Sequence, residues 1–390
     1  MTGGGSGGHI TPILAVASEL KRLRPEVRIV YIGQKGESLL DIPAQDPSID
    51  EVRVVRAGKF RRYHGEGWRQ VFNLATQARN VRDAFFVLIG IWQSFWLLRR
   101  LKPSVIFTRG GFVSVPVALA GVLRRVPYIT HDSDSVPSLA NRLIARWAHV
   151  HAVALPPETY PYPPDKTVMV GIPLSDKYQP VTPRLQAQYR HELELDEFEQ
   201  VVLVTGGGNG ARKLNAAILE NAVRLLKHYP KLCLLHVSGR ALEAELRRNY
   251  DGLLAPEDTG RVRVIGFAPD FYRYSGAADV IVARGGATNL AEFAVQAKAC
   301  IIVPATRLVG DHQTKNAQVL VKKHAIVTLS EDQAEQDGRL ARTIAELLGN
   351  TRERQQLRQN LAQFARTDAA ERLAMLLLDE ANFKNKPASS

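Results

Sequence analysis

The chain has 390 residues, of which 45% are hydrophobic and 23% are charged. This balance is typical of globular proteins and excludes a disordered or fibrous chain, and the length favours two domains over one. The only two cysteines, Cys233 and Cys300, lie far apart and belong to no CxxC pair. A disulfide framework and a cysteine-rich zinc site are therefore excluded, and we expect two buried thiols in a reducing compartment.

Positive charge is concentrated in the first part of the chain. The formal net charge is +12, and residues 1–175 contribute 22 basic against 13 acidic side chains. Residues 53–102 alone hold 11 basic and two acidic ones. A basic surface of this kind attracts phosphate groups, either of nucleic acid or of anionic lipid. A nucleic-acid interface needs aromatic residues interleaved with Lys and Arg on a groove or a sheet, and we recognise no such motif, so we expect no nucleic-acid partner.

Short apolar segments typical of buried strands alternate with segments long enough for helices. Five of them precede the middle of the chain, at residues 27–32, 52–55, 105–108, 128–130 and 150–153. Apolar strands connected by helices predict parallel sheets with helices on both faces. A glycine-rich loop begins at Gly3, although such loops normally follow a strand. We therefore expect the first strand to be missing, or the sheet to begin elsewhere.

An uncharged run of 15 residues lies between Asp83 and Arg99. It is shorter than the roughly 20 residues that cross a hydrocarbon core, and it is internal, unlike a signal peptide. Basic residues flank it on both sides, and four apolar side chains recur on one helical face: Phe85, Ile89, Trp92 and Trp96. This pattern favours a helix lying in a membrane interface, so residues 79–102 are expected to contact an anionic membrane surface. The alternative is a core helix packed on a sheet.

A proline-rich stretch separates this half from a second series of strands. Eight of the 21 prolines fall between Pro156 and Pro183, which indicates a domain joint. The second series covers residues 201–205, 232–237, 262–265, 280–283, 300–303 and 326–329. We expect one domain over residues 1–172, a second over 173–366, and a C-terminal helix with a disordered tail over 367–390. Residues 352–383 have a helical pattern.

Four glycine clusters stand where strands are expected to end. They are residues 3–8, 110–111, 206–210 and 285–286, and glycine lets a ligand approach the main chain closely while the next helix start favours phosphate. The first and third match the dinucleotide-binding pattern. The strands that follow them end without the acidic residue that holds the ribose, which argues against NAD. A Walker A loop is excluded because His9 and Ala211 stand where its lysine is required.

The last glycine cluster offers another way to hold a nucleotide. It lies in the segment Arg284-Gly-Gly-Ala-Thr-Asn-Leu-Ala-Glu292, which predicts a turn before a helix. A carboxylate one turn into the helix can accept hydrogen bonds from a ribose diol while the helix start holds a diphosphate. The Arg284 guanidinium could add positive charge there. The alternative for Glu292 is a solvated helix residue.

At these residues the sequence resembles MurG-type glycosyltransferases. The motifs that carry the resemblance occur in the family's order from about residue 3 to 370: GGGSGGHITPILAVASEL, GGFVSVPVALA, GGGNGARKLN, GF followed by ADVIVARGGATNLAEF, and DHQTKNA. The resemblance implies an α/β protein of two Rossmann-like domains, the GT-B fold. It implies transfer of N-acetylglucosamine from UDP-GlcNAc to the muramyl sugar of lipid I, with inversion and without metal or cofactor, at the cytoplasmic side of the inner membrane.

The resemblance also implies roles for individual residues. The acceptor side would be formed by the first glycine loop and the segment after the fourth strand, with Ser6, Gly7, Gly8, His9 and Asp134. In the second domain Phe267 would contact uracil and Glu292 the ribose, while Gln313 and Asn316 would contact the GlcNAc hydroxyls. The diphosphate would be held by Gly207, Gly208, Asn209, Gly210, Gly286, Ala287 and Thr288.

The chain departs from the family pattern at three places. His131-Asp132-Ser133-Asp134 stands where the family usually has His-Glu-Gln-Asn, so that Asp134 replaces an amide. The joint at residues 171–175 lacks the Asn and Arg of Gly-Asn-Pro-Val-Arg. A Ser-Gln pair near the diphosphate is replaced by Gly208 and Asn209.

Glycosyl transfer needs donors for the leaving diphosphate and a base for the attacking hydroxyl. His9 is our first candidate base, with a diphosphate donor as its alternative role, and Asp132 or Asp134 is the alternative base. Asp132-x-Asp134 also resembles a metal-binding DxD pair, but short matches arise by chance and no metal is expected. Three classes of function remain: the lipid I transferase, a related transferase for another lipid such as diacylglycerol, and a non-catalytic membrane-bound nucleotide-sugar binding protein.

Overall fold

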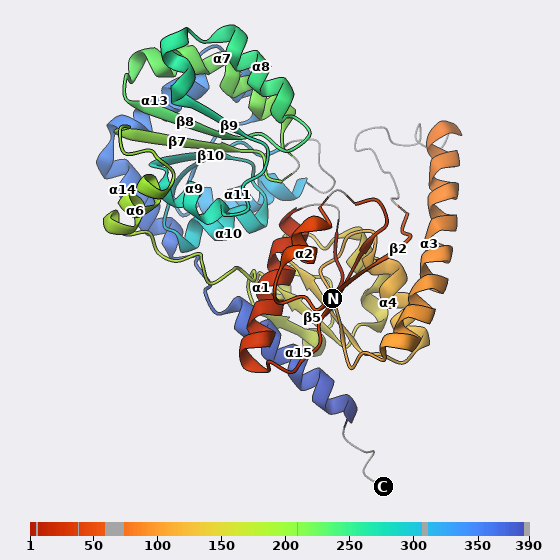
Figure 1. The fold of residues 1–390 in the computed structure, drawn as a ribbon. Helices are drawn as coiled ribbons and strands as arrows, with labels where there is room; N and C mark the ends of the chain where they lie inside the picture. The colour runs from red at the N-terminus through yellow and green to blue at the C-terminus, as the bar shows by residue number, and fades with distance from the viewer. Residues whose placement is uncertain (5–6, 38, 59–73, 209, 306–310, 386–390) are drawn as a thin grey trace. The chain divides into compact units, whose positions relative to one another are not determined.

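The protein is described here from a computed structural model that covers residues 1–4, 7–37, 39–58, 74–208, 210–305 and 311–385. The chain divides into two compact units (Figure 1). One comprises Met1–Ser175 with Thr367–Ser390, and the other Asp176–Arg366. The joint thus lies three residues beyond the expected one, and the segment after residue 366 belongs to the first unit. Each unit is described by itself.

The first unit contains parallel strands that are short and mostly buried. β1 pairs with β2, and β3 to β6 form a second group in chain order. The strand that normally precedes a glycine-rich loop was expected to be missing, or the sheet to begin elsewhere; in the structure Thr2 alone bridges Ile32 and Thr108. The strands are β1 (Val30–Gln34), β2 (Glu51–Val55), β3 (Ile106–Thr108), β4 (Tyr128–Asp132), β5 (Val150–Val153) and β6 (Thr167–Met169). The last was not predicted, because three residues in a proline-rich stretch show no pattern.

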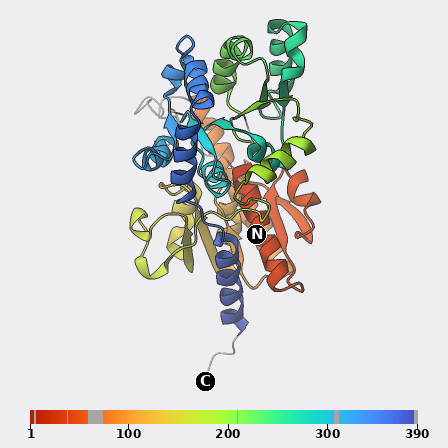
Figure 2. The ribbon, with the colours of Figure 1, turned by 90° about the vertical axis from the view of Figure 1, so that its left-hand side faces the viewer.

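Helices cover the sheet of the first unit. They are α1 (Gly7–Leu23), α2 (Asp41–Gln45), α3 (Leu74–Leu101), α4 (Ser114–Leu123), α5 (Leu139–Ile144) and α15 (Ala369–Asn385). Short 3-10 turns occupy Ala145–Trp147, Pro157–Thr159 and Pro164–Lys166. Figures 1 and 2 show α15, the last helix of the chain, beside α1. Ile10 and Ile13 of α1 share a buried core with Leu373 and Leu377 of α15, so the two ends of the chain complete one hydrophobic core.

The described residues of the second unit form a parallel sheet of six strands in the order β12-β11-β10-β7-β8-β9. The strands are β7 (Gln200–Thr205), β8 (Leu232–Val237), β9 (Val262–Ile265), β10 (Val280–Ala283), β11 (Ala299–Ile302) and β12 (Val327–Thr328). The chain reverses its direction of winding between β7 and β10. Ligands of open α/β sheets bind outside the carboxyl ends of the strands at such a point. Residues 206–208 and 285–286 lie at these two ends.

Buried cores cover both faces of this sheet, which explains the apolar strands. The helices are α6 (Pro183–Glu192), α7 (Arg212–His228), α8 (Glu243–Leu253), α9 (Phe271–Ala277), α10 (Ala287–Val295), α11 (His312–Val321), α12 (Glu331–Glu335), α13 (Arg339–Gly349) and α14 (Thr351–Ala362), with a 3-10 turn at Pro256–Arg261. The helical pattern of residues 352–383 corresponds to two helices, because α14 ends at Ala362 and α15 begins at Ala369.

Candidate functional site

In the first unit two glycine segments pack against each other at the carboxyl ends of the strands. Gly3 and Gly4 follow the Thr2 bridge, and Gly110 and Gly111 follow β3. Gly111 has φ +81°, and a Cβ atom on it would lie 2.6 Å from the Gly4 carbonyl oxygen. Only glycine allows this close approach. The packing places the start of α1 beside the segment after β3.

His9, in the first turns of α1, contacts this second segment. Its Nδ1 lies 3.0 Å from the main-chain carbonyl oxygen of Arg109. A carbonyl oxygen only accepts, so Nδ1 carries the proton and Nε2 carries the lone pair. Burial, followed by the positive charge of Arg109, lowers the His9 pKa below its ordinary 6.5. His9 is therefore neutral near pH 7 and able to accept a proton at Nε2.

The buried side chain of Arg109 connects three parts of the first unit. Nη1 donates to the Gly8 carbonyl oxygen at 2.7 Å, Nη2 donates to Ser133 Oγ, and Nε lies 3.4 Å from His131 Nδ1. A guanidinium with donors in a fixed fork is suited to this role. We did not predict it from the sequence, although a charged residue between a buried strand and a Gly-Gly pair is an unusual feature.

His131, at the carboxyl end of β4, is a neutral connector. Its Nε2 lies 2.8 Å from the Gly171 carbonyl oxygen and donates to it, which leaves Nδ1 to accept from Arg109. Burial and the Arg109 charge lower the His131 pKa to about 3. His131 thus links the Arg109 cluster to the segment that leads to the second unit.

Asp132 is 4% exposed and its carboxylate accepts several protein donors. The Tyr162 hydroxyl donates to Oδ2 at 2.7 Å, and the Ser138 main-chain N–H donates to Oδ1 at 3.1 Å. Burial raises the Asp132 pKa, against the opposing effect of the hydrogen bonds from Tyr162, Asn141 and Ser138. These contacts favour a structural role, in which Asp132 holds the loop that carries Asp134.

Asp134 is partly exposed, and its negative charge acts to raise the His9 pKa, so the two side chains are close enough to interact. Gly7 begins α1, whereas Ser6 lies outside the described residues. Within the described parts of the chain no three His, Cys, Asp or Glu side chains gather in a way that could hold a metal ion.

In the second unit the segment after β7 forms a tight turn. Gly207 has φ +80°, and its N–H donates to Thr205 Oγ1 at 3.1 Å. Gly210 donates back to the Gly207 carbonyl oxygen at 2.9 Å, and a Cβ atom on Gly210 would lie 2.0 Å from the Ser238 carbonyl oxygen. This turn leads into α7. Gly208 belongs to the turn, and Asn209 lies outside the described residues.

The N-terminus of α10 lies beside this turn. Gly286 is the N-cap residue with extended backbone, and Ala287 and Thr288 form the first turn, at the end of the helix that favours negative charge. Asn289 Oδ1 lies 3.7 Å from a Cβ built on Gly207 and 3.8 Å from one built on Gly286. The two glycine loops therefore meet around Asn289, a residue that sequence reasoning did not single out.

Glu292 lies one turn further along α10 and is 5% exposed. Asn289 Nδ2 donates to its Oε2 at 2.9 Å, and the Tyr178 hydroxyl also hydrogen-bonds this carboxylate. A carboxylate oriented by neighbours beside an open helix start is suited to a ribose diol. Glu292 is therefore not a solvated residue on the surface of a helix, which was the alternative interpretation.

Arg284 directly follows β10, but its guanidinium contacts residues other than the glycine loops. Nη1 donates to the Val303 carbonyl oxygen at 2.9 Å, and Nη2 donates to Glu331 Oε1 at 2.7 Å, with both side chains buried. This favours a role in fixing β10 to its neighbours over the expected direct contact with a diphosphate.

Gln313 and Asn316 of α11 hold the loops after β10 and β11. Gln313 Oε1 accepts from the Ala305 N–H at 3.0 Å, and Asn316 Nδ2 donates to the Gly285 carbonyl oxygen at 3.2 Å. Phe267 follows β9, and the Arg240 guanidinium lies 4.7 Å from its ring centroid. The expected donor-site residues thus gather at the carboxyl edge of the sheet, and Arg240 joins them as a residue that we did not predict.

Two units of this kind, each with glycine loops at the carboxyl edge of a parallel sheet, define the GT-B class of glycosyltransferase fold. The solved structure of Acinetobacter baumannii MurG matches with a TM-score of 0.65 at 21% identity, over 97% of this chain and 98% of that one. The UDP-GlcNAc 2-epimerase from Neisseria meningitidis bound to UDP-GlcNAc matches with a TM-score of 0.64 at 13% identity, over 97% and 98%.

Sequence comparison agrees with the fold. A Limosilactobacillus fermentum protein named UDP-N-acetylglucosamine--N-acetylmuramyl-(pentapeptide) pyrophosphoryl-undecaprenol N-acetylglucosamine transferase is 29% identical over 384 residues, which is 97% of this chain and 96% of that protein. The family models of the N-terminal and C-terminal domains of glycosyltransferase family 28 match residues 1–153 and 201–373. The chain therefore belongs to glycosyltransferase family 28 and, within it, to the MurG family.

Proposed function

We propose that this protein transfers N-acetylglucosamine from UDP-GlcNAc to the C4 hydroxyl of the muramyl sugar of lipid I, which forms lipid II for peptidoglycan synthesis. The observation that carries the proposal is the meeting of the Gly207 and Gly286 loops around Asn289, with Glu292 one turn along α10. That arrangement suits a nucleoside diphosphate. The family membership and the relatives' names support the particular sugar and acceptor.

On the donor side, the reaction breaks the bond between the anomeric carbon and the UDP oxygen. Negative charge then grows on the leaving diphosphate. N–H groups at the start of α10 and in the turn after β7 would stabilise this charge without reorganising. Glu292 would hold the ribose hydroxyls, Phe267 the uracil, and Gln313 with Asn316 the GlcNAc hydroxyls.

On the acceptor side, the C4 oxygen forms the new bond to the anomeric carbon and loses its proton. We assign His9 Nε2 as the acceptor of that proton, because the Arg109 carbonyl occupies the other ring nitrogen. Attack on the face opposite the diphosphate inverts the anomeric configuration. Asp134 would contact the acceptor sugar. This scheme assigns no metal ion, because N–H groups would stabilise the negative charge of the diphosphate through hydrogen bonds.

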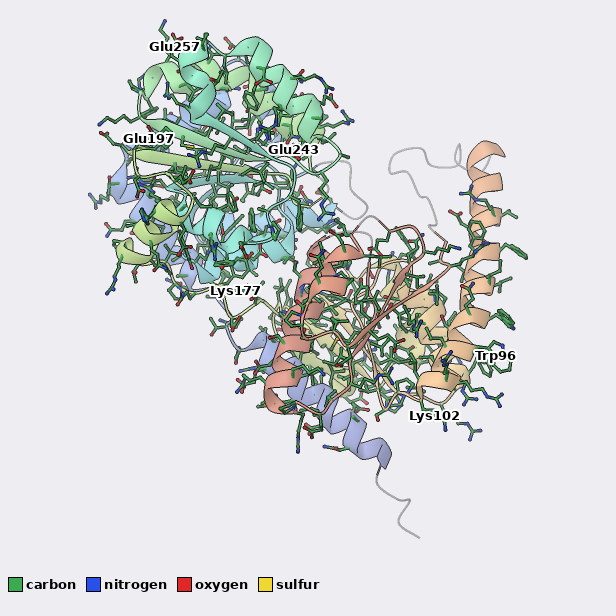
Figure 3. All side chains as sticks on the ribbon, viewed as in Figure 1. Trp96, Lys102, Lys177, Glu197, Glu243 and Glu257 are labelled. Atoms are coloured by element: carbon green, nitrogen blue, oxygen red, sulfur yellow. The ribbon has the colours of Figure 1, made fainter. Side chains whose placement is uncertain are left out.

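The surface of α3 supports contact with a membrane that carries the lipid acceptor. Phe85 is 62% exposed, Trp92 66% and Trp96 48%, while Asp83, Ser94 and Leu98 form the buried face. Figure 3 shows Trp96 and Lys102 near the C-terminal end of α3. The Arg99 guanidinium lies 5.2 Å from the Trp96 ring centroid. An exposed apolar face bordered by cations suits a peripheral helix at an anionic, cytoplasmic membrane surface.

The helix is longer than the uncharged run suggested. Among the described residues, Val81–Leu101 is long and apolar enough to cross a membrane by length and composition alone, so the expectation that it is too short does not hold on that criterion. Its buried face packs on α4, and a Cβ atom on Gly90 would lie 3.1 Å from Pro116 Cβ. This packing favours the interfacial position.

An acceptor-dependent assay tests the proposal. Purified protein with UDP-GlcNAc and a lipid I analogue should release UDP and form the disaccharide product. Release of UDP with diacylglycerol in place of lipid I would support the second class of function. Tight UDP binding without turnover on either acceptor would support the non-catalytic binding protein, and both results would contradict the proposal.

A further inference from the structure

The segment that follows the joint between the units is fixed along α10, the helix that would hold the nucleotide. The Val181 N–H lies 3.4 Å from the Gln296 carbonyl oxygen at the C-terminal end of α10. Arg358 holds the two segments together. Its Nη2 donates to the Val181 carbonyl oxygen at 3.2 Å, and its Nε donates to the Ala297 carbonyl oxygen at 2.8 Å. The backbone just beyond the joint is therefore anchored.

Tyr178 lies three residues before this anchor and reaches the same helix at Glu292, one turn before Gln296. Its hydroxyl hydrogen-bonds the Glu292 carboxylate. Its ring stands edge-on to Tyr272, with 6.2 Å between the centroids and 72° between the planes. Tyr272 is itself tied to α10, since its carbonyl oxygen accepts from Gln296 Nε2 at 2.7 Å. The Tyr178 ring is thus held by packing, and its hydroxyl is directed at Glu292.

We propose that Tyr178 is a positioning residue for ribose recognition, which holds Glu292 in the rotamer that accepts the 2′- and 3′-hydroxyls of a uridine nucleotide. A carboxylate accepts up to about four hydrogen bonds, so protein donors and a diol can share it. Asn289 and Tyr178 approach Glu292 from different elements, α10 itself and the segment after the joint. Two such donors restrict the rotation of a long side chain that would otherwise lose entropy on binding.

This inference rests on the proposed nucleotide site but not on the identity of the acceptor. It implies that nucleotide binding and the packing of residues 178–181 on α10 are coupled. A nucleotide that binds Glu292 also stabilises the contact of this segment with the helix. Tyr178 does not contact the reacting atoms in this scheme. It should therefore affect nucleotide affinity and discrimination between ribose and deoxyribose, while kcat at saturating donor changes little.

Titration calorimetry with UDP and 2′-deoxy-UDP tests the inference. The wild-type protein should prefer UDP. Tyr178→Phe, which keeps the ring, should weaken UDP binding about 3- to 10-fold and reduce the preference over 2′-deoxy-UDP. Tyr229→Phe is the matched control, because it removes one hydroxyl that donates to the Ala345 carbonyl oxygen elsewhere in the unit, and it should bind UDP normally. In a Glu292→Ala background, Tyr178→Phe should cause no further loss.

Three results would overturn the inference. One is a Tyr178→Phe protein whose UDP affinity and deoxyribose discrimination equal those of the wild type while Glu292→Ala is impaired. Another is an equal loss for both nucleotides, which would indicate general damage to the unit. If the wild-type protein binds UDP without preferring it to 2′-deoxy-UDP, the assignment of Glu292 to the ribose hydroxyls is itself wrong. Failure of lipid I turnover with intact discrimination would contradict only the proposed acceptor.

Discussion

His9 Nδ1 and the main-chain carbonyl oxygen of Arg109 are 3.0 Å apart, and this contact decides which ring nitrogen can accept a proton. If His9 Nε2 is the base, His9→Ala should lower kcat by roughly 10²- to 10⁴-fold, the usual contribution of general base catalysis. UDP affinity should stay near the wild-type value. Steady-state kinetics with a lipid I analogue, together with UDP titration, measure both quantities. A His9→Ala variant with near-normal kcat would show that His9 is not the base.

The pH dependence of kcat should depend on the positive charge of Arg109, which lies beside His9. The neutral form is the active one, and burial with the Arg109 charge keeps the His9 pKa below 6.5. As pH falls, activity should therefore persist until below pH 6.5 and then decline. In Arg109→Gln the positive charge is gone, so the decline should move to higher pH. Arg28→Gln removes a charge that is paired with Glu51 at the surface and serves as the control. An acidic limb that does not move in Arg109→Gln would contradict this explanation.

Asp132 and His9 can be separated as candidate bases by measuring stability beside activity. Asp132→Asn keeps the shape of the side chain but alters its bonds with Tyr162 and Ser138. We expect the free energy of unfolding to fall by about 1–3 kcal/mol, with a far smaller loss of kcat than in His9→Ala. Urea unfolding and kinetics measure the two effects. Unchanged stability with abolished turnover would instead make Asp132 the base.

Membrane binding should depend on the exposed face of α3. Replacing both Trp92 and Trp96 with Ser should weaken binding to anionic liposomes at least about tenfold, because two large apolar side chains no longer enter the interface. Leu253→Ser, at a residue of α8 that is 44% exposed, is the control and should bind normally. Liposome sedimentation measures binding. Normal binding combined with a lower unfolding temperature would identify α3 as a core helix.

Buried His236 should make the second unit sensitive to acid. Its ring contacts the Tyr250 hydroxyl and Asn215 Oδ1, and burial lowers its pKa to about 3. Between pH 6.5 and 3 the unfolded chain binds a proton that the folded unit does not. Stability should therefore fall as the pH falls, by up to about 1.4 kcal/mol per pH unit. Urea unfolding at pH 7 and pH 5 should show a smaller difference for His236→Gln than for the wild type.

The sequence was sufficient to predict the architecture because buried parallel strands are continuous apolar runs. β5, β8, β9 and β10 begin and end at the predicted residues. β6 has three residues and no such run, so only its pairing with β5 reveals it. The break between α14 and α15 was also missed, since residues on both sides continue a helical pattern.

The site was predictable where a backbone conformation requires glycine, as at Gly207 and Gly210, or where a family motif is matched, as at Glu292. Arg109, Asn289 and Tyr178 were missed, because their importance comes from contacts across the fold. Arg284 illustrates the reverse case. Its place beside a glycine loop suggested a phosphate contact, but its long side chain reaches Glu331 instead. Position along the chain does not specify the direction of a flexible side chain.

The packing of α15 on α1 has a consequence for biosynthesis. Residues 176–366 form a continuous unit and can fold once they have left the ribosome. The earlier unit has to wait for the final helix, which supplies Leu373 and Leu377 to its interior. During translation the first-made half of the polypeptide is therefore the last to be completed, and a nascent chain halted near residue 366 exposes apolar surface on which chaperones could act.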